Sequence, residues 1–354
     1  MTRPLSSVEG FDFDAVLVLS YGGPRRPEDV LPFMRNATRG RGIPDERLVE
    51  VSEHYMLFGG ASPINDRNDE LMDALRAELS ARGVDVPVVI GNRNWDPYVA
   101  DTLAELAASG ARRVIALATS AYASYSSCRQ YREDLAAGLA ASGVELDLVK
   151  VGPFAETPGF VAANADAVRA ALAELPGARV LFVTHSIPLA MDAASGPRPS
   201  AVEPVETTYS AQHQRVARAV ADEVGLADDA WEIVYCSRSG APHIPWLEPD
   251  VNDRLAELAS EGVTSVITVP FGFISDHMEV VYDLDTEARA TAEGLGLGYV
   301  RAATVGVHPA FVAMLADALV DPRPGQVGGV PTCGASCCLS GRPGPALPAA
   351  CGTD

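Results

Sequence analysis

The chain has 354 residues, with a hydrophobic fraction of 47% and a charged fraction of 21%, which is the composition of a folded protein long enough for two domains. Its formal net charge of −20 argues against binding to nucleic acid or to anionic lipid, because both would be repelled. No apolar run reaches the length of a transmembrane helix and no apolar signal segment opens the sequence, so we expect a cytoplasmic protein without membrane association.

Short apolar runs and amphipathic stretches alternate along the chain, which is the pattern of an α/β fold built on parallel sheets. The apolar runs are rich in β-branched residues and almost continuous, as buried parallel strands are. In chain order the predicted strands are Ala15–Ser20, Val86–Ile90, Arg113–Ala118, Arg179–Thr184, Trp231–Tyr235 and Thr264–Pro270. The predicted helices are Asp69–Ala81, Asp101–Ser109, Gly159–Glu174, Ser210–Val224, Asn252–Ser260 and Ala310–Leu319.

An internal repeat indicates two similar halves. Residues 97–117 and residues 249–269 match at 11 of 21 positions, over a helix, a glycine turn and a strand in one register. We therefore expect two doubly wound, Rossmann-like domains, over residues 1–155 and 156–320, with the last helix packed back on the first half. A Pro, Gly and Ser-rich stretch, Ala194–Val205, predicts a surface loop within the second domain.

The C-terminal extension, residues 321–354, is rich in Pro, Gly and Ala and has no periodicity, yet it holds most of the cysteines. Cys333, Cys337, Cys338 and Cys351 lie in the last 22 residues, whereas Cys128 and Cys236 lie in the body. In a cytosolic chain this clustering favours metal or iron–sulfur ligation over disulfides. The basic residues are also uneven, since 26 arginines accompany one lysine, Lys150.

The residues that follow the predicted strands carry the candidate chemistry, because ligands of open α/β sheets bind beyond the carboxyl ends of the strands. Tyr21, His185 and Glu279 follow three different strands and could meet in one site. A histidine and a carboxylate suit transient binding of a divalent metal. Glu279, Asp283 and Glu287 are spaced four residues apart on one helical stripe, a path for a cation. The alternative is a structural histidine beside a solvated acidic face.

Nucleotide binding is disfavoured although the fold class allows it. The Gly-rich turn at residues 59–63 has no lysine after it, so it is not a P-loop. No dinucleotide-binding glycine motif follows the first predicted strand.

Taken together, these segments resemble the ferrochelatase family, whose members insert Fe²⁺ into a porphyrin. The resemblance runs in family order across nearly all of residues 14–320, and it implies two Rossmann-like domains with a porphyrin cleft between them. The matching stretches are VLVLSYGGP (16–24), TRGR (38–41), HYMLFGGASPIN (54–65), GNRNWDP (91–97), VTHSIP (183–188), SRSG (237–240), PWLEPDV (245–251) and PFGFISDHMEVVYDLDTEA (270–288).

The resemblance also implies roles for individual residues. His185 and Glu279 match the family's metal-binding and catalytic pair, and Asp283 and Glu287 match a metal-entry stripe. Tyr21 matches a position over the porphyrin face that can serve as an axial iron ligand. The porphyrin-binding positions match Tyr21, Arg39, Ser62 and Tyr131, with Tyr125 as an alternative to Tyr131.

Within the family the chain resembles the short bacterial enzymes that convert coproporphyrin III to coproheme in haem biosynthesis. It lacks a long apolar lip, and the corresponding segment, residues 35–47, is polar and rich in arginine. Arginine pairs well with carboxylates, and coproporphyrin carries four propionates. The alternatives are a protoporphyrin IX ferrochelatase, a non-catalytic haem or porphyrin carrier and a cobalt chelatase, which the motifs fit poorly. Haem-pathway enzymes upstream and downstream are possible partners.

Some family members carry a [2Fe–2S] cluster in a C-terminal extension. The vertebrate pattern has one ligand in the body and three in the tail, but the body position that corresponds here, in residues 162–167, has no cysteine. The four tail cysteines could form a complete Cys₄ site, or three of them could combine with Cys128 or Cys236. The remaining alternative is an unstructured tail with free thiols.

Overall fold

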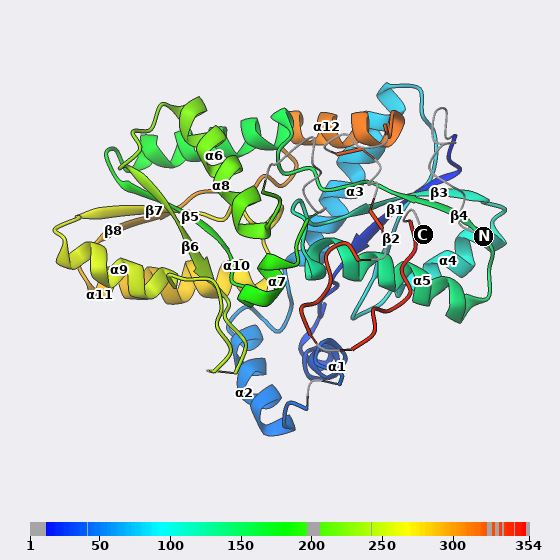
Figure 1. The fold of residues 1–354 in the computed structure, drawn as a ribbon, viewed down its shortest axis with the longest axis horizontal. Coiled ribbons are helices and arrows are strands. Elements are labelled where there is room, and N and C mark those ends of the chain that lie inside the picture. Colours follow the sequence, from blue (N-terminus) through cyan, green and yellow to red (C-terminus); the bar gives the residue numbers. More distant parts are fainter. Residues whose placement is uncertain are drawn as a thin grey trace.

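The computed structural model describes residues 12–40, 42–196, 206–241, 243–323, 328–329, 333–334, 336–342 and 344–351. Two four-stranded parallel sheets lie side by side with helices on both faces (Figure 1). The strand order is β2-β1-β3-β4 in one sheet and β6-β5-β7-β8 in the other, so the two halves share one topology. The predicted α/β fold of two similar Rossmann-like halves is confirmed.

The strands of the first sheet are β1 (Ala15–Ser20), β2 (Val88–Asn92), β3 (Arg113–Ala118) and β4 (Asp147–Lys150); those of the second are β5 (Arg179–His185), β6 (Trp231–Cys236), β7 (Ser265–Val269) and β8 (Gly298–Arg301). The edge strands β4 and β8 escaped prediction because they are only partly buried and lack a continuous apolar run. The prediction for β2 was two residues early, since Pro87 has no N–H for the ladder.

The helices are α1 (Pro27–Ala37), α2 (Asp45–Met56), α3 (Ile64–Ala81), α4 (Val99–Ala108), α5 (Gln130–Ser142), α6 (Pro158–Glu174), α7 (Leu189–Ala193), α8 (Tyr209–Val224), α9 (Val251–Ser260), α10 (Met278–Tyr282), α11 (Arg289–Gly294) and α12 (Pro309–Val320), with π-helical segments η2 (Tyr125–Arg129) and η3 (Asp283–Ala288). Every predicted helix is present within a few residues of its expected bounds. Helix α2 escaped prediction because it buries one side chain, Leu48, and so has no apolar stripe.

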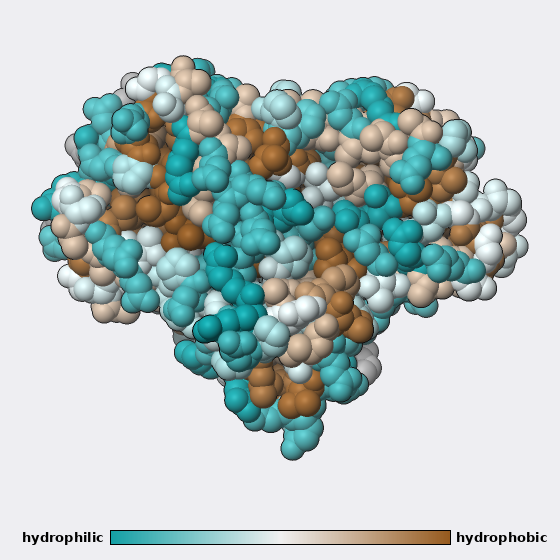
Figure 2. Space-filling view, turned by 180° about the vertical axis from the view of Figure 1, so that it is seen from behind, coloured by the Kyte–Doolittle hydropathy of each residue, from teal (hydrophilic) through white to brown (hydrophobic). Residues whose placement is uncertain are grey.

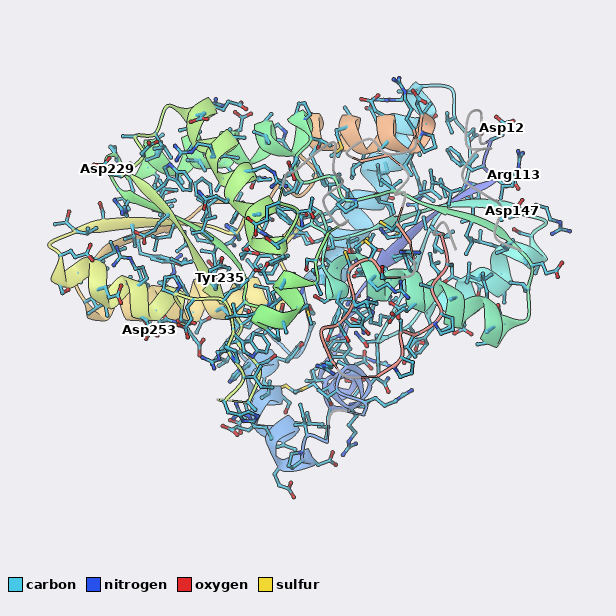
Figure 3. All side chains as sticks on the ribbon, viewed as in Figure 1. Asp12, Arg113, Asp147, Asp229, Tyr235 and Asp253 are labelled. Carbon is cyan, nitrogen blue, oxygen red and sulfur yellow. The ribbon has the colours of Figure 1, made fainter. Side chains whose placement is uncertain are left out.

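The internal repeat has a structural counterpart. It forms α4 and β3 in the first half and α9 and β7 in the second, and the two helices begin at the corresponding residues Val99 and Val251. The carboxyl ends of the strands point toward the middle of the molecule: Arg113 opens β3 at one outer end and Asp229 precedes β6 at the other, whereas Tyr235 near the end of β6 lies centrally (Figure 3). The residues after the strands of both sheets therefore face the boundary between the halves.

Helix α12 packs on helices of both halves, α3 and α6. It lies between α3 and α6 (Figure 1), and Arg82 at the end of α3 donates to the Ala313 carbonyl of α12 at 3.1 Å. The rings of Phe154, Phe160 and Phe311 pack with centroids 5.8–6.2 Å apart and fix α12 on α6. Truncating such a buried ring costs about 3–5 kcal/mol.

The structure leaves two expectations open. The predicted loop Ala194–Val205 lies outside the described residues beyond Gly196, and the exact domain bounds stay a prediction. Within the described part of the chain, no helix is both long and apolar enough to cross a membrane.

Candidate functional site

His185 and Glu279 form a pair at the boundary between the halves. His185 is the last residue of β5 and Glu279 lies in the first turn of α10, with 3.5 Å between His185 Nε2 and Glu279 Oε1. The Nδ1 of His185 is hydrogen-bonded to the Ser186 carbonyl, and because a carbonyl can only accept, Nδ1 carries the proton. The Nε2 lone pair and the carboxylate therefore face the same point, as ligands of one metal would.

Burial and nearby acids act on the pKa of His185 in opposite directions. Burial lowers the pKa of His185, but the charge and hydrogen bond of Glu279 and the more distant Asp283 raise it above its ordinary value. The neighbouring His277 lies with Nδ1 4.0 Å from the other Glu279 oxygen, and burial lowers the pKa of that imidazole. Two imidazoles thus flank one carboxylate, although among the described residues no three His, Cys, Asp or Glu side chains surround a common metal position.

Asp283 and Glu287 lie beyond Glu279 on the same helical segment. Asp283 opens the π-helical turn η3 and accepts a hydrogen bond from the Ser237 hydroxyl. Burial raises the pKa of Asp283 to about 7; the Ser237 bond opposes this rise, and the charges of Glu279 and Glu287 add to it. In an α-helix, residues four apart differ by about 40° in direction around the helix axis. The π-helical turn has more residues per turn, so it offsets that difference. The three carboxylates of the predicted stripe therefore lie near one another.

Tyr21 approaches this pair from the first half. It follows β1, is 38% exposed, and meets the edge of Phe33 at a ring distance of 6.1 Å. Burial raises the pKa of Tyr55 and the charges of Tyr21 and Glu279 add to the rise, so Tyr55 lies within electrostatic range of both residues. The glycine after Tyr21 is required, because Gly22 has φ +78° and a Cβ there would lie 2.9 Å from Asn92.

Helix α2 closes the site on one side. His54 of α2 stacks on Tyr282 of α10 with ring centroids 3.9 Å apart and an interplanar angle of 8°. The outer face of α2 exposes Val49 and Met56, and hydrophobic surface is visible at this tip of the molecule (Figure 2). The polar, arginine-rich segment 35–47 is therefore followed in the chain by a helix with exposed apolar side chains.

Of the predicted porphyrin-binding residues, Arg39 and Ser62 lie in the first half. Arg39 is exposed after α1, donates to Asn36 Oδ1 at 2.7 Å and makes no ion pair with any acid among the described residues. By contrast, Arg35 is paired with Asp45 at 2.7 Å. Ser62 is buried before α3, where its hydroxyl accepts from the Ile64 N–H at 3.4 Å. Arg39 therefore remains available for an anionic ligand.

Tyr131 is covered. Its ring is buried in α5 beneath Arg93, whose guanidinium carbon lies 4.2 Å from the ring centroid. Arg93 bonds Asp134 at 2.6 Å, but its Nη2 is buried without a hydrogen-bond partner. The alternative, Tyr125, is half-buried and donates to Glu133 at 3.0 Å. A porphyrin role for Tyr131 stays a prediction that would require Arg93 to move.

The tail brings cysteines together beside the first half. Cys333 is hydrogen-bonded to Cys337, and the sulfurs of Cys337 and Cys338 are 3.6 Å apart. Cys128 in η2 lies close enough to perturb both Cys337 and Cys351. Burial raises the pKa of the Cys351 thiol to about 12. Cys128 thus faces the tail.

Cys236 lies near Glu279 and Asp283 and not beside the tail. It ends β6, its sulfur accepts a hydrogen bond from the Ser237 hydroxyl at 3.3 Å, and the nearby acids are Asp283, Glu279 and Asp250. Of the two body cysteines that the sequence offered as partners for the tail, Cys128 is therefore the one that lies beside it.

Comparison with known proteins identifies the family of both halves of the chain. The ferrochelatase family model matches residues 13–322. The chain belongs to the ferrochelatase family. It is 52% identical to the coproporphyrin III ferrochelatase of Streptomyces coelicolor, over 97% of this chain and 96% of the relative. To the coproporphyrin III ferrochelatase of Streptomyces griseus it is 53% identical, over 87% of this chain and 85% of the relative.

Among solved structures, this ferrochelatase-family chain shares its fold with a multi-domain protein from Deinococcus radiodurans that has structural similarity to chelatases. The TM-score is 0.50 at 17% sequence identity. The alignment covers 90% of this chain and 57% of the other, so this chain spans little more than half the length of that protein. At this identity the likeness is one of fold.

Sequence reasoning did not assign roles to His277, Tyr55 or Arg93. The first lies two residues from Glu279 and could have been found from that spacing. Tyr55 and Arg93 come near the site because α2 and the segment after β2 pack there, and no local pattern in the sequence predicts that packing.

Proposed function

We propose that the protein is a ferrochelatase that inserts Fe²⁺ into coproporphyrin III to give coproheme. The observation that carries this proposal is the His185–Glu279 pair, 3.5 Å apart at the boundary between the two halves. Membership of the ferrochelatase family and about half-identity to coproporphyrin III ferrochelatases support the same reaction.

The chemistry requires a base and a route for the metal, since two pyrrole protons leave as Fe²⁺ enters the ring. The Nε2 lone pair of His185 would take up a pyrrole proton or pass Fe²⁺ to the ring. Glu279 would assist as a base and as a metal ligand, and Asp283 and Glu287 would lead the cation inward. Tyr21, which comes from the first half, would lie on the opposite face and ligate the inserted iron.

The substrate choice rests on charge. Arg39 is an exposed cation with no carboxylate partner among the described residues, and guanidinium groups bind carboxylates through two parallel hydrogen bonds. Coproporphyrin III offers more propionates to such a site than protoporphyrin IX, so we propose it as the physiological substrate.

An anaerobic insertion assay with Fe²⁺ and each porphyrin, followed by loss of porphyrin fluorescence, tests this function. We expect turnover with coproporphyrin III and a kcat/KM at least tenfold lower with protoporphyrin IX. The reverse order would establish the protoporphyrin alternative. Tight binding of either porphyrin or its haem without any insertion would favour a carrier.

We also propose that the tail holds a [2Fe–2S] cluster ligated by Cys128, Cys333, Cys337 and Cys338. The residue type fits, because such clusters are held by four thiolates, although no three of the described cysteine sulfurs surround one metal position. Its surroundings also fit: the buried Arg132 keeps an Nη2 without a hydrogen-bond partner, as a cationic pocket for an anionic centre would. When bound, the cluster would supply a redox-active centre that ties the tail together. Insertion of Fe²⁺ is redox-neutral and needs no electron from it.

The proposed ligand set shares Cys338 with the sequence-based one and differs from it in taking Cys128 in place of Cys351. Cys338 Sγ accepts the Gly196 N–H at 3.2 Å, a bond that a thiolate strengthens. Cys351 Sγ donates to the Leu148 carbonyl at 3.4 Å, which requires its proton. We therefore assign Cys128 in place of Cys351. Iron and sulfide analysis of anaerobically purified Cys128→Ser and Cys351→Ser protein tests this choice, because only the first should lose the cluster.

We place the reaction in the cytoplasm, because none of the six cysteines, all of which lie within the described ranges, forms a disulfide, and a reducing compartment keeps thiols in that state. Coproheme carries propionates where haem carries vinyl groups, so a downstream haem-pathway enzyme would have to convert them by oxidative decarboxylation.

A further inference from the structure

Two buried cations lie beside the tail cysteines. Lys150, at the end of β4, is 2% exposed and Arg132, in α5, is 1% exposed. The Nζ of Lys150 donates to the Val151 carbonyl at 2.9 Å and lies 3.7 Å from Cys128 Sγ. Arg132 donates through Nε to the Ala350 carbonyl at 2.8 Å, and its Nη2 has no partner.

Neither cation is paired with an acid among the described residues. The contrast with Arg129, one turn before Arg132 in the same part of the chain, is direct: Arg129 is equally buried and bonds Glu133 at 3.0 Å. A buried charge without a partner is strongly unfavourable, so proteins pair such groups or use them to hold an ion of opposite charge. The structure pairs Arg129 with a carboxylate, whereas Lys150 Nζ lies 3.7 Å from a cysteine sulfur and Arg132 Nη2 has no hydrogen-bond partner.

Two sulfurs of the proposed cluster lie beside these cations, and so does Cys351, which lies outside the ligand set. Lys150 Nζ contacts Cys128 Sγ, and the charges of Lys150 and Arg132 act on both Cys333 and Cys351. A [2Fe–2S] centre with four thiolates is anionic, because thiolates and sulfides outweigh two ferric ions. Reduction adds a further negative charge, so neighbouring cations favour the reduced form more than the oxidised one.

We propose that Lys150 and Arg132 are the charge partners of the iron–sulfur centre: they lie outside its ligand set, balance its negative charge and raise its reduction potential. The inference rests on the proposed cluster. Lys150 and Arg132 are positioning residues and touch no substrate.

The test is an EPR-monitored redox titration of the full chain, purified anaerobically, with Lys150→Met and Lys150→Arg compared to wild type. At a fixed ambient potential we expect Lys150→Met to lower the ratio of reduced to oxidised cluster at least tenfold, which is 59 mV for a one-electron couple. Lys150→Arg should restore most of the shift. Arg169→Met, which removes an exposed charge from α6, is the matched control and should leave the potential unchanged.

Each other outcome is decisive. An unchanged potential and iron content in Lys150→Met would overturn the inference while leaving the cluster in place. If Lys150→Met binds no cluster, iron content restored by Lys150→Arg supports the charge role, and iron content absent from both variants refutes it. Should Lys150→Met fail to fold, Arg132→Gln carries the same titration with the same expected direction. A wild-type protein without iron or sulfide after reconstitution would overturn the cluster itself, and the inference with it.

Discussion

Replacing Asp283 with asparagine should stabilise the protein above neutral pH and have little effect in acid. Burial raises the pKa of Asp283 from 3.8 to about 7, with Glu279 and Glu287 adding to the rise and the Ser237 hydrogen bond opposing it. The folded protein therefore holds a proton on Asp283 that the unfolded chain releases between about pH 4 and pH 7. In that window stability falls as the pH rises, and the loss is complete above the folded-state pKa. An asparagine is neutral throughout and keeps the oxygen that accepts from Ser237.

The size of the effect follows from the pKa difference. The difference between a pKa of 3.8 and one of about 7 corresponds to about 4 kcal/mol, which is a ceiling because Asp283 is only partly buried and solvent screens it. We expect about 1–2 kcal/mol of added stability at about pH 8, a rise in Tm of about 2–8 °C for domains of this size.

Thermal unfolding of iron-free and porphyrin-free protein at about pH 5 and about pH 8 measures this directly. The matched control is Asp166→Asn, because the exposed Asp166 pairs with Arg169 at 2.7 Å and that pair lowers its pKa. The control should not become more stable at either pH. A gain for Asp283→Asn that is equal at both pH values would indicate a packing effect, and no gain at pH 8 would refute the electrostatic argument.

The other predictions concern metal entry, substrate and the tail. Asp283→Ala and Glu287→Ala should each raise the KM for Fe²⁺ about tenfold and change kcat less than about threefold, since they guide the cation and do not react; an unchanged iron dependence would make them a solvated face. Arg39→Met should raise the KM for coproporphyrin III more than that for protoporphyrin IX, and equal effects on both porphyrins would remove its role in selectivity. Cys333→Ser should bleach the brown colour of the anaerobically purified protein, whereas Cys351→Ser should keep it; the opposite pattern would return Cys351 to the ligand set.

The sequence predicted those parts of the structure that depend on local pattern. Buried strands such as β1 and β5 are continuous apolar runs, and the residues that follow them must lie at the same edge of a sheet. That rule, applied to the sequence, is enough to bring His185 and Glu279 to one site. The half-buried edge strands β4 and β8 carry no such run, and were missed for that reason.

Contacts between distant segments were not predictable in the same way. Cys128 meets the tail because η2 and the C-terminal residues pack on one side of the first sheet, and no spacing in the sequence reports that proximity. The family resemblance assigns Tyr131 to the porphyrin site, with Tyr125 as the alternative, but Arg93 from a segment far away in the chain covers the Tyr131 ring. The sequence shows that Lys150 is the one lysine of the chain, but it does not show that this lysine is buried beside the sulfur of Cys128.

The most direct test of the central claim is the His185→Ala variant in the anaerobic insertion assay with coproporphyrin III. The side chain lies at a strand end, 29% exposed, so its loss should leave the fold and the Tm nearly unchanged. The account predicts that insertion falls below detection while coproporphyrin III still binds with a Kd close to that of wild type. Near-wild-type turnover in a folded variant would contradict the account, because the pair that carries the reaction would then lie elsewhere.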